Sequence, residues 1–233
     1  MKKSIGILGG MGPMATAELF SKIVSMTKAS GDPEHIRIYM DNNPTVPDRT
    51  AAILKGGESP VPALRESAEK LCSCGADCII MSCNTAHYFL PELQKSCPVP
   101  ILNMPEITAA ECKKAYPGKC AGILATSGTI KAGIYQQALE KQGIKYLVPD
   151  DKLQNIIMKI IYDDIKAGKK PEDYKEDMDC VFESLRAEGA EVFILGCTEL
   201  SVAKEELGLN IPFVDSTDAL AKAAIEFCGY EIK

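Results

Sequence analysis

Two stretches decide the fold of this chain, Ala76-Asp77-Cys78-Ile79-Ile80-Met81-Ser82-Cys83-Asn84-Thr85 and, much later, Ala190-Glu191-Val192-Phe193-Ile194-Leu195-Gly196-Cys197-Thr198. Each is a short apolar run that ends in a cysteine followed by small polar residues. A run that is apolar at every position is typical of a strand buried on both faces of a parallel sheet. The repetition indicates two similar halves with one such strand in each.

A second echo supports this division. The run Ile5-Gly6-Ile7-Leu8 resembles Ala121-Gly122-Ile123-Leu124, and Gly6 precedes Cys83 by 77 residues where Gly122 precedes Cys197 by 75. Further apolar runs alternate with amphipathic stretches along the chain. We expect strands at residues 4–8, 36–39, 78–81, 99–102, 120–125, 145–148, 192–195 and 213–214, and helices at residues 13–28, 62–74, 105–116, 132–142, 152–167, 174–188 and 217–228.

Strands separated by helices predict an α/β fold in which helices cover both faces of a parallel sheet. We therefore expect two similar three-layer α/β/α domains with mainly parallel sheets. The first domain takes residues 1–103 and the second residues 104–212. The C-terminal segment, residues 213–233, is expected to pack back onto the first domain.

Composition sets limits on the class of protein. The chain has 233 residues, of which 46% are apolar and 25% charged, as in ordinary globular proteins. Its net charge of −6 argues against binding to nucleic acid or to an anionic membrane. No apolar run approaches the roughly 18–20 residues of a membrane span, and the first residues lack a signal-peptide core. We expect a cytoplasmic protein whose ten cysteines are reduced thiols.

Cys83 and Cys197 stand at the carboxyl ends of their strands, where open parallel sheets bind ligands. If a helix begins after each cysteine, its N-terminus would lower the pKa of the thiol. Asn84, Thr85 and Thr198 would add hydrogen-bond donors for an anion. The alternative is that both cysteines are core residues. Their symmetric placement favours a functional role.

A metal site is not expected. Cys72, Cys74 and Cys78 lack the second pair of ligands that structural zinc sites use, and the chain has only two histidines. His87 lies four residues after Cys83. It could orient a thiol or help to bind substrate. The alternative is a hydrogen-bonded helix histidine without a role in chemistry.

The loop Gly9-Gly10-Met11-Gly12-Pro13 separates the first strand from the first helix. Gly10-x-Gly12-x-x-Ala15 formally fits the dinucleotide fingerprint, with Asp41 as the ribose-binding acid. However, Asp41 lies 29 residues after Gly12, where about 20 is usual, and Pro13 removes an amide that would face a pyrophosphate. We expect a tight turn that lines a small-molecule site and includes Met11. A dinucleotide-dependent oxidoreductase stays an alternative.

Several further residues are candidates for binding an anionic substrate. Arg49, in a loop rich in Asn and Pro, either binds a carboxylate or pairs with Asp48 at the surface. Lys166 either contacts substrate or complements a helix dipole. The run Thr126-Ser127-Gly128-Thr129 offers hydroxyls and amides for a carboxylate. Glu199 either binds an α-amino group or is an ordinary acid in the first turn of a helix.

Taken in order, the motifs resemble those of the cofactor-independent aspartate/glutamate racemase superfamily, and of its aspartate racemases in particular. The resemblance covers nearly the whole chain. The matching runs are Ile5-Gly6-Ile7-Leu8-Gly9-Gly10-Met11-Gly12-Pro13, Asn42-Asn43-Pro44 with Asp48-Arg49-Thr50, Cys83-Asn84-Thr85-Ala86-His87, Leu124-Ala125-Thr126-Ser127-Gly128-Thr129 and Gly196-Cys197-Thr198-Glu199.

The resemblance implies two similar α/β domains with the active site in the cleft between them, no pyridoxal phosphate, no metal, and a homodimer. It implies that Cys83 and Cys197 are the catalytic cysteines, that Arg49 binds a substrate carboxylate and that Lys166 binds substrate. The substrate-binding set that we expect comprises Met11, Arg49, Asn84, Thr85, Thr126, Ser127, Thr129, Lys166, Thr198 and Glu199.

The resemblance also gives the two thiols a reaction. One thiolate removes the α-proton from one face of an amino acid while a thiol returns a proton to the other face. The expected activity is racemisation of aspartate. Glutamate racemisation, decarboxylation or cis–trans isomerisation of a small diacid, and dicarboxylate binding without catalysis stay open as alternatives.

Overall fold

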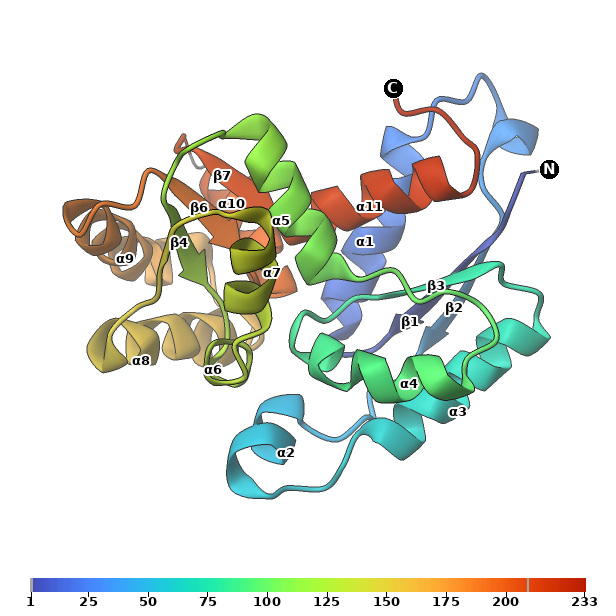
Figure 1. Ribbon diagram of the computed structural model, residues 1–233, viewed down its shortest axis with the longest axis horizontal. Coiled ribbons are helices and arrows are strands. Elements are labelled where there is room, and N and C mark those ends of the chain that lie inside the picture. The colour runs from blue at the N-terminus through green and yellow to red at the C-terminus, as the bar shows by residue number, and fades with distance from the viewer. Residues whose placement is uncertain (1, 209) are drawn as a thin grey trace.

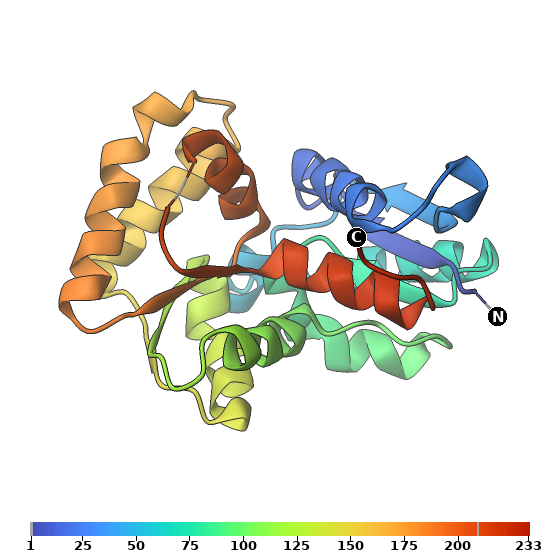
Figure 2. The ribbon, with the colours of Figure 1, turned by 90° about the horizontal axis from the view of Figure 1, so that it is seen from above.

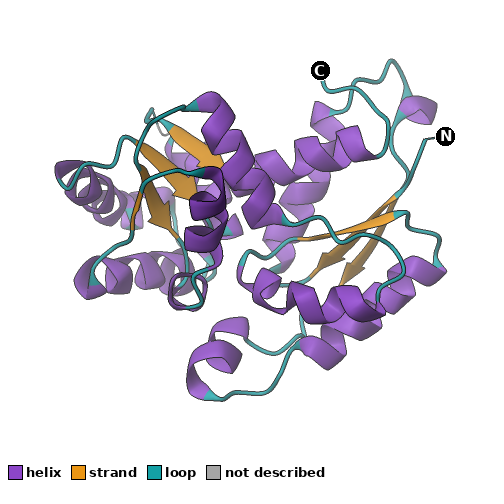
Figure 3. Cartoon of the chain, in the orientation of Figure 1, coloured by secondary structure: helices purple, strands orange, loops and turns teal. Residues whose placement is uncertain are grey.

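The computed structural model describes residues 2–208 and 210–233 and shows two lobes, each built on its own parallel sheet (Figures 1 and 3). The first sheet, in the order β2-β1-β3, consists of β1 (Ile5–Gly9), β2 (Ile38–Asn42) and β3 (Cys78–Met81). The second, in the order β5-β4-β6-β7, consists of β4 (Ala121–Leu124), β5 (Tyr146–Leu147), β6 (Val192–Leu195) and β7 (Phe213–Asp215). All pairings within these sheets are parallel, so the expected α/β class is confirmed.

The runs that are repeated in the sequence form the central strand of each sheet and a neighbour that pairs with it. Strand β1 pairs with β3, and β4 pairs with β6 in the same manner. Gly6 and Gly122 occupy equivalent places, because a Cβ at Gly6 would lie 3.0 Å from the Cβ of Ala76 and one at Gly122 would lie 3.1 Å from the Cβ of Ala190. In both lobes, therefore, the glycine makes room for the alanine that precedes the cysteine-ended strand.

Helices cover both faces of the first sheet. Alternate residues of β1 and β3 enter opposite clusters, with Ile7 and Ile80 on one face and Leu8 and Met81 on the other, which explains why these strands are apolar throughout. The helical segments that follow the strands of this lobe are α1 (Pro13–Met26), η1 (Asp32–Glu34), α2 (Arg49–Lys55), α3 (Val61–Ser73), η2 (Thr85–Phe89) and α4 (Leu90–Ser96).

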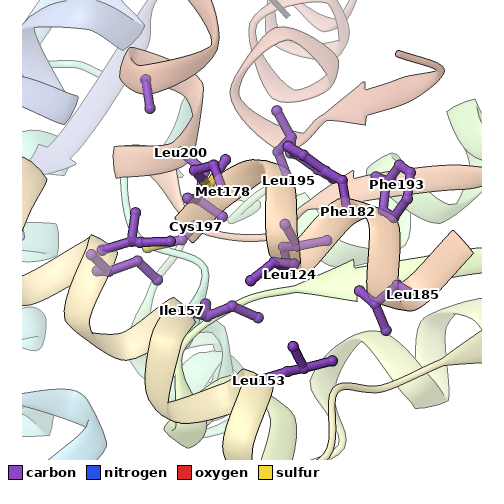
Figure 4. Packing of buried hydrophobic residues seen from close by; sticks show 14 of the residues in the cluster. Leu124, Leu153, Ile157, Met178, Phe182, Leu185, Phe193, Leu195, Cys197 and Leu200 are labelled. Atoms are coloured by element: carbon purple, nitrogen blue, oxygen red, sulfur yellow. The ribbon is translucent and has the colours of Figure 1, made fainter. Parts of the chain in front are cut away.

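The second lobe has the same plan. Figure 4 shows part of its larger hydrophobic cluster, in which Cys197 packs with Met178 and Leu200. Its helical segments are α5 (Met104–Ala115), α6 (Ser127–Lys131), α7 (Ile134–Gln142), α8 (Asp151–Lys159), the π-helix η3 (Ile160–Ile165), η4 (Pro171–Asp173), α9 (Lys175–Ala187) and α10 (Thr198–Leu207).

The last helix, α11 (Ser216–Phe227), follows the second sheet but runs to the first lobe, where it lies beside α1 (Figure 2). Its residues Leu220 and Ile225 belong to the same cluster as Ile5 and Ile7 of β1. Helix α11 thus packs against the first sheet, whereas residues 213–215, which were expected to pack there too, form β7 of the second sheet. The domain limits at residues 103 and 212 stay a prediction.

The strand expected at residues 99–102 is wrong. Only Ile101 forms a bridge there, to Ile79 of β3. Pro98 and Pro100 lack the N–H groups that a regular ladder needs. The helix expected at residues 152–167 is also divided, since α8 ends at Lys159 and π-helical turns continue the segment.

Within residues 2–208 and 210–233, no helix is long and apolar enough to cross a membrane. The same described residues hold no group of three or more His, Cys, Asp or Glu side chains placed to bind a metal ion.

Candidate active site

The two cysteine-ended strands bring their thiols to one pocket between the lobes. Cys83 follows β3 after Ser82, and Cys197 follows β6 after Gly196 and caps the N-terminus of α10. Both are buried, with 7% and 6% of their surface exposed. They line a small cavity of about 10 Å³. Its walls are Met11, Arg49, Thr50, Cys83, Asn84, Thr85, Thr126, Tyr162, Lys166, Cys197, Thr198 and Glu199.

The cavity contains every residue of the expected site except Ser127 and Thr129. Thr129 is fully buried behind Thr126, to whose hydroxyl its own lies 3.1 Å away. The N–H of Ser127 donates to the sulfur of Met158 instead of facing the cavity. The structure thus brings both cysteines together with eight of the ten expected substrate-binding residues.

A larger cavity of about 660 Å³ adjoins the small one. The two share Met11, Arg49, Lys166 and Glu199, so these residues stand at the boundary between them. The outer cavity is also lined by the start of α1 and by apolar side chains such as Val46, Ile165 and Val202. The inner cavity has room for about one water molecule, so an amino acid that reaches the thiols would extend past the two cations into the outer cavity.

Arg49 is fixed by its own loop. Its Nη1 donates to the carbonyl oxygens of Val46 and Pro47 at 3.1 and 3.0 Å, and its Nη2 donates to that of Met11 at 3.3 Å. The alternative of a surface ion pair with Asp48 does not hold, because Asp48 caps α2 by accepting from the N–H of Ala51. Burial opposes the charge of Arg49, but the Cys83 sulfur and Asp48 raise its pKa, so that the guanidinium stays charged beside Cys83.

Cys197 has a different environment. Its Sγ donates to Oε2 of Glu199 at 3.0 Å, and Nζ of Lys166 lies 3.5 Å from the other oxygen of that carboxylate. Burial and then Glu199 raise the pKa of the Cys197 thiol well above its ordinary value, whereas Lys166 acts in the opposite direction. The backbone N–H of Glu199, at the start of α10, does lower this pKa as expected, but burial and the Glu199 carboxylate outweigh it, so the net shift is upward.

Lys166 is placed by the π-helix. Its backbone N–H donates to the carbonyl of Ile161, five residues earlier, at 3.1 Å. Its ammonium group lies 4.7 Å from the centre of the Tyr162 ring, over the face of that ring. Burial opposes its charge, but Glu199 and Cys197 raise its pKa. Lys166 therefore serves as a cation of the site and not only as a complement to a helix dipole.

Polar residues that follow each cysteine form hydrogen bonds with residues of the other lobe. The hydroxyl of Thr85 lies 2.9 Å from those of both Thr126 and Thr129, which come from the second lobe. The hydroxyl of Thr198 donates to the carbonyl of Ser82 at 3.4 Å. These contacts fix the separation of the lobes at the cavity.

The side chain of Asn84 makes two buried hydrogen bonds. It donates to Ser216 Oγ at 3.1 Å and accepts from the hydroxyl of Tyr135.

His87 is a structural histidine. The N–H of Met104 donates to its Nε2 at 3.2 Å, so its Nδ1 carries the proton and donates to the carbonyl of Cys83 at 2.9 Å. Burial lowers the pKa of His87 to about 4. The ring is neutral and joins the Cys83 turn to the start of α5, as in the alternative of a hydrogen-bonded helix histidine.

The glycine loop at residues 9–13 packs closely against the backbone of Asn43. Gly10 has a φ of +90°, and a Cβ on it would lie 2.2 Å from the carbonyl carbon of Asn43. Only glycine fits this position. Asp41 lies within β2, opposite Leu8, and not after it as a ribose-binding acid would. The loop accordingly fits the tight turn beside a small-molecule site.

Two lining residues, Thr50 and Tyr162, were missed by the sequence analysis. Thr50 directly follows Arg49, and this position beside a candidate site residue was the only signal in the sequence. Tyr162 lies one helical turn before Lys166, and its hydroxyl donates to Asp48 at 3.2 Å. The π-helix places the Tyr162 ring against the ammonium group of Lys166. The sequence pattern did not indicate a π-helix.

Comparisons with known proteins identify relatives over nearly the whole chain. The model of the Asp/Glu/hydantoin racemase family matches residues 8–224. The broad specificity amino-acid racemase RacX of Bacillus subtilis is 30% identical over 230 residues, which cover 95% of this chain and 96% of that protein. The structure of Picrophilus torridus aspartate racemase superposes with a TM-score of 0.86 at 36% identity, covering 99% of this chain and 96% of that one.

These findings define the protein as an isomerase of the amino-acid racemase class. It belongs to the Asp/Glu/hydantoin racemase family.

Proposed function

We propose that the protein interconverts L- and D-aspartate, with Cys83 and Cys197 as the two acid/base groups and without pyridoxal phosphate. The observation that carries the proposal is the placement of two thiols, from equivalent strand ends of two lobes, in one small cavity. A substrate α-carbon between them would meet one sulfur on each face. A thiolate on one side takes the α-proton while the thiol on the other side delivers a proton.

The charged residues support an anionic substrate. Arg49 and Lys166 stand at the mouth of the inner cavity. Two cations there suit the two carboxylates of aspartate, and they would stabilise the negative charge that passes onto the α-carboxylate when the proton leaves. The protein as a whole is negatively charged, with a net charge of −6, so attraction of such a substrate depends on these local cations.

The remaining expected contacts belong to the same proposal. Five residues of the cavity wall would contact the substrate: Met11, Asn84, Thr85, Thr126 and Thr198. Glu199 would accept hydrogen bonds from the ammonium group of the substrate. Ser127 and Thr129 would act from behind that wall by holding Thr126 and the start of α6.

The test is proton NMR of L-aspartate with the reduced protein in deuterated water. We expect the α-proton signal to disappear as D-aspartate forms. Cys83→Ala and Cys197→Ala are each expected to abolish racemisation, whereas Cys180→Ala, at an exposed helix position, should retain it. Racemisation at the original rate in either of the first two variants would refute the two-thiol scheme.

A second candidate activity rests on the outer cavity. Its volume of about 660 Å³ beyond Arg49 and Lys166 leaves space for a side chain longer than that of aspartate. One methylene changes binding by only about 1–3 kcal/mol, so glutamate is a reasonable second substrate. The same NMR assay with glutamate distinguishes the two. Tight binding of both amino acids without α-proton exchange would identify a binding protein.

Two further expectations, a homodimer and a cytoplasmic location, stay predictions. Sedimentation of the purified protein would test the first, and fractionation of the source cells would test the second.

A further inference from the structure

The two thiols of the cavity have unequal surroundings. Cys83 faces the guanidinium of Arg49, which is held in place by three carbonyl oxygens. Cys197 instead donates its S–H proton to the carboxylate of Glu199. One thiol therefore lies beside a fixed cation and the other beside an anion.

The Glu199 carboxylate is itself held on both sides. Its Oε2 accepts from Cys197 at 3.0 Å and from the hydroxyl of Thr198 at 3.3 Å, while its Oε1 lies 3.5 Å from Lys166. Glu199 is 6% exposed. A carboxylate in this position favours the protonated form of its thiol neighbour, since ionising Cys197 would place two anions within hydrogen-bond distance.

Other titratable groups also face this pair. Lys166 and Tyr162 approach from the π-helix, Cys83 and Arg49 from the opposite wall, and Tyr135 from α7. Lys166 and the backbone N–H of Glu199 favour a thiolate at Cys197. Arg49 is bound to its own loop next to Cys83, so Lys166 is the cation that opposes Glu199 at this thiol.

We propose that Glu199, besides facing the substrate ammonium group, keeps Cys197 protonated, so that Cys197 is the acid of the pair and the role of base falls to Cys83. The inference rests on the proposed two-thiol reaction. The enzyme then begins with Cys83 as base and Cys197 as acid. For the opposite enantiomer the single proton must first move to Cys83, with Glu199 and Lys166 adjusting to the anion on Cys197.

The first test reads Cys197 directly and does not require activity. In a Cys83→Ser background, alkylation of Cys197 by iodoacetamide is followed against pH by peptide mass spectrometry. Glu199→Gln keeps a hydrogen-bond acceptor but removes the charge, so we expect the midpoint of alkylation to move to lower pH by about one to two pH units. Glu199→Asp keeps the charge and should leave the midpoint near its original value.

Lys166→Met supplies a change of opposite sign. Without this cation the carboxylate acts unopposed, and the alkylation midpoint should move to higher pH. A general loosening of the site would shift all variants in the same direction. Glu191→Gln, at a side chain that is 45% exposed on the same lobe, controls for the loss of a distant charge. Equal alkylation midpoints in the Glu199→Gln variant and in its parent would overturn the proposal.

The second test uses catalysis in the protein with both cysteines. We expect Glu199→Gln to move the basic limb of the kcat/KM profile to lower pH by about one to two pH units and to leave the acidic limb nearly in place. Enantiomers have equal free energies, so kcat/KM in the two directions must remain equal at every pH. An unchanged basic limb in active protein would refute the role of Glu199. If no variant or parent protein exchanges the α-proton, the two-thiol reaction fails, while the alkylation test still decides the role of Glu199.

Discussion

The hydroxyl of Tyr135, on α7 of the second lobe, donates to the side-chain oxygen of Asn84, the residue that follows Cys83 in the first lobe. The same ring lies against the turn of the other cysteine, since a Cβ at Gly196 would come within 2.7 Å of it. Asn84 continues the connection through Ser216, whose hydroxyl donates to the carbonyl of Leu195 at 2.8 Å. One buried side chain therefore helps to fix the positions of both thiols.

Tyr135→Phe should destabilise the protein and slow racemisation together. The variant leaves a buried amide oxygen of Asn84 without its donor, which costs about 1–3 kcal/mol of unfolding free energy. Urea denaturation measures this loss. Tyr146→Phe is the matched control, because that hydroxyl binds Glu140 at the exposed surface and its removal should cost under about 0.5 kcal/mol. Equal losses in the two variants would show that the Asn84 contact contributes nothing particular.

The components of the site were predictable from the sequence, but their connections were not. Cys83, Cys197, Arg49 and Lys166 are identified by strand ends and motifs. The pairing of Cys197 with Glu199 depends on the rotation of one side chain at a helix start. The contact of Thr85 with two threonines of the other lobe depends on how the lobes meet, which no local pattern encodes.

The fold shows the same division. Periodicity identified the long helices except α10, which was expected only as a possible helix start after Cys197. The short segments α2, α4, α6 and η2, of five to seven residues each, were missed. A periodic pattern needs more residues than these segments supply. The π-helical turns before Lys166 were also not predictable, since six residues are too few for a hydrophobic pattern to distinguish a π-helix from an α-helix.

Gly128→Ala should lower kcat/KM by displacing α6 from the first lobe. A Cβ at this position would lie 2.8 Å from Thr50 Oγ1 and 3.1 Å from Thr85 Cγ2, both across the junction of the lobes. Overpacking of this kind costs about 1–3 kcal/mol, which corresponds to roughly a tenfold to hundredfold loss if the site bears the strain. Steady-state assays of both enantiomers measure it. Gly31→Ala, with nothing nearer than 3.9 Å, should retain full activity.

His87 should make the protein less stable in acid. Its pKa is about 4 in the folded state, against an ordinary value of 6.5, because the ring is buried. Between these values the unfolded chain binds more protons than the folded one, so the unfolding free energy falls as the pH decreases from 6.5 towards 4, by up to about 3 kcal/mol. In His87→Asn this part of the pH dependence should vanish.

Thermal unfolding at several pH values between 4 and 7 compares the parent, His87→Asn and His35→Asn. The last variant controls for loss of an imidazole at a partly buried position. If the parent and His87→Asn lose stability in parallel over this range, the buried neutral ring is not a source of the acid sensitivity.

Arg49→Lys should impair substrate binding although it conserves the charge. The guanidinium donates at once to the carbonyls of Val46, Pro47 and Met11, and thereby holds the loop before α2 against the glycine turn. A lysine ammonium is a point charge that cannot make this planar set of bonds while it faces a carboxylate. We expect KM for aspartate to rise at least about tenfold, which corresponds to about 1.4 kcal/mol. Arg65→Lys is the control, because Arg65 is 43% exposed and lies 3.6 Å from Glu92 at the surface. Should Arg49→Lys bind aspartate as the parent does, the positive charge alone would suffice, and the fork of hydrogen bonds would serve only the loop.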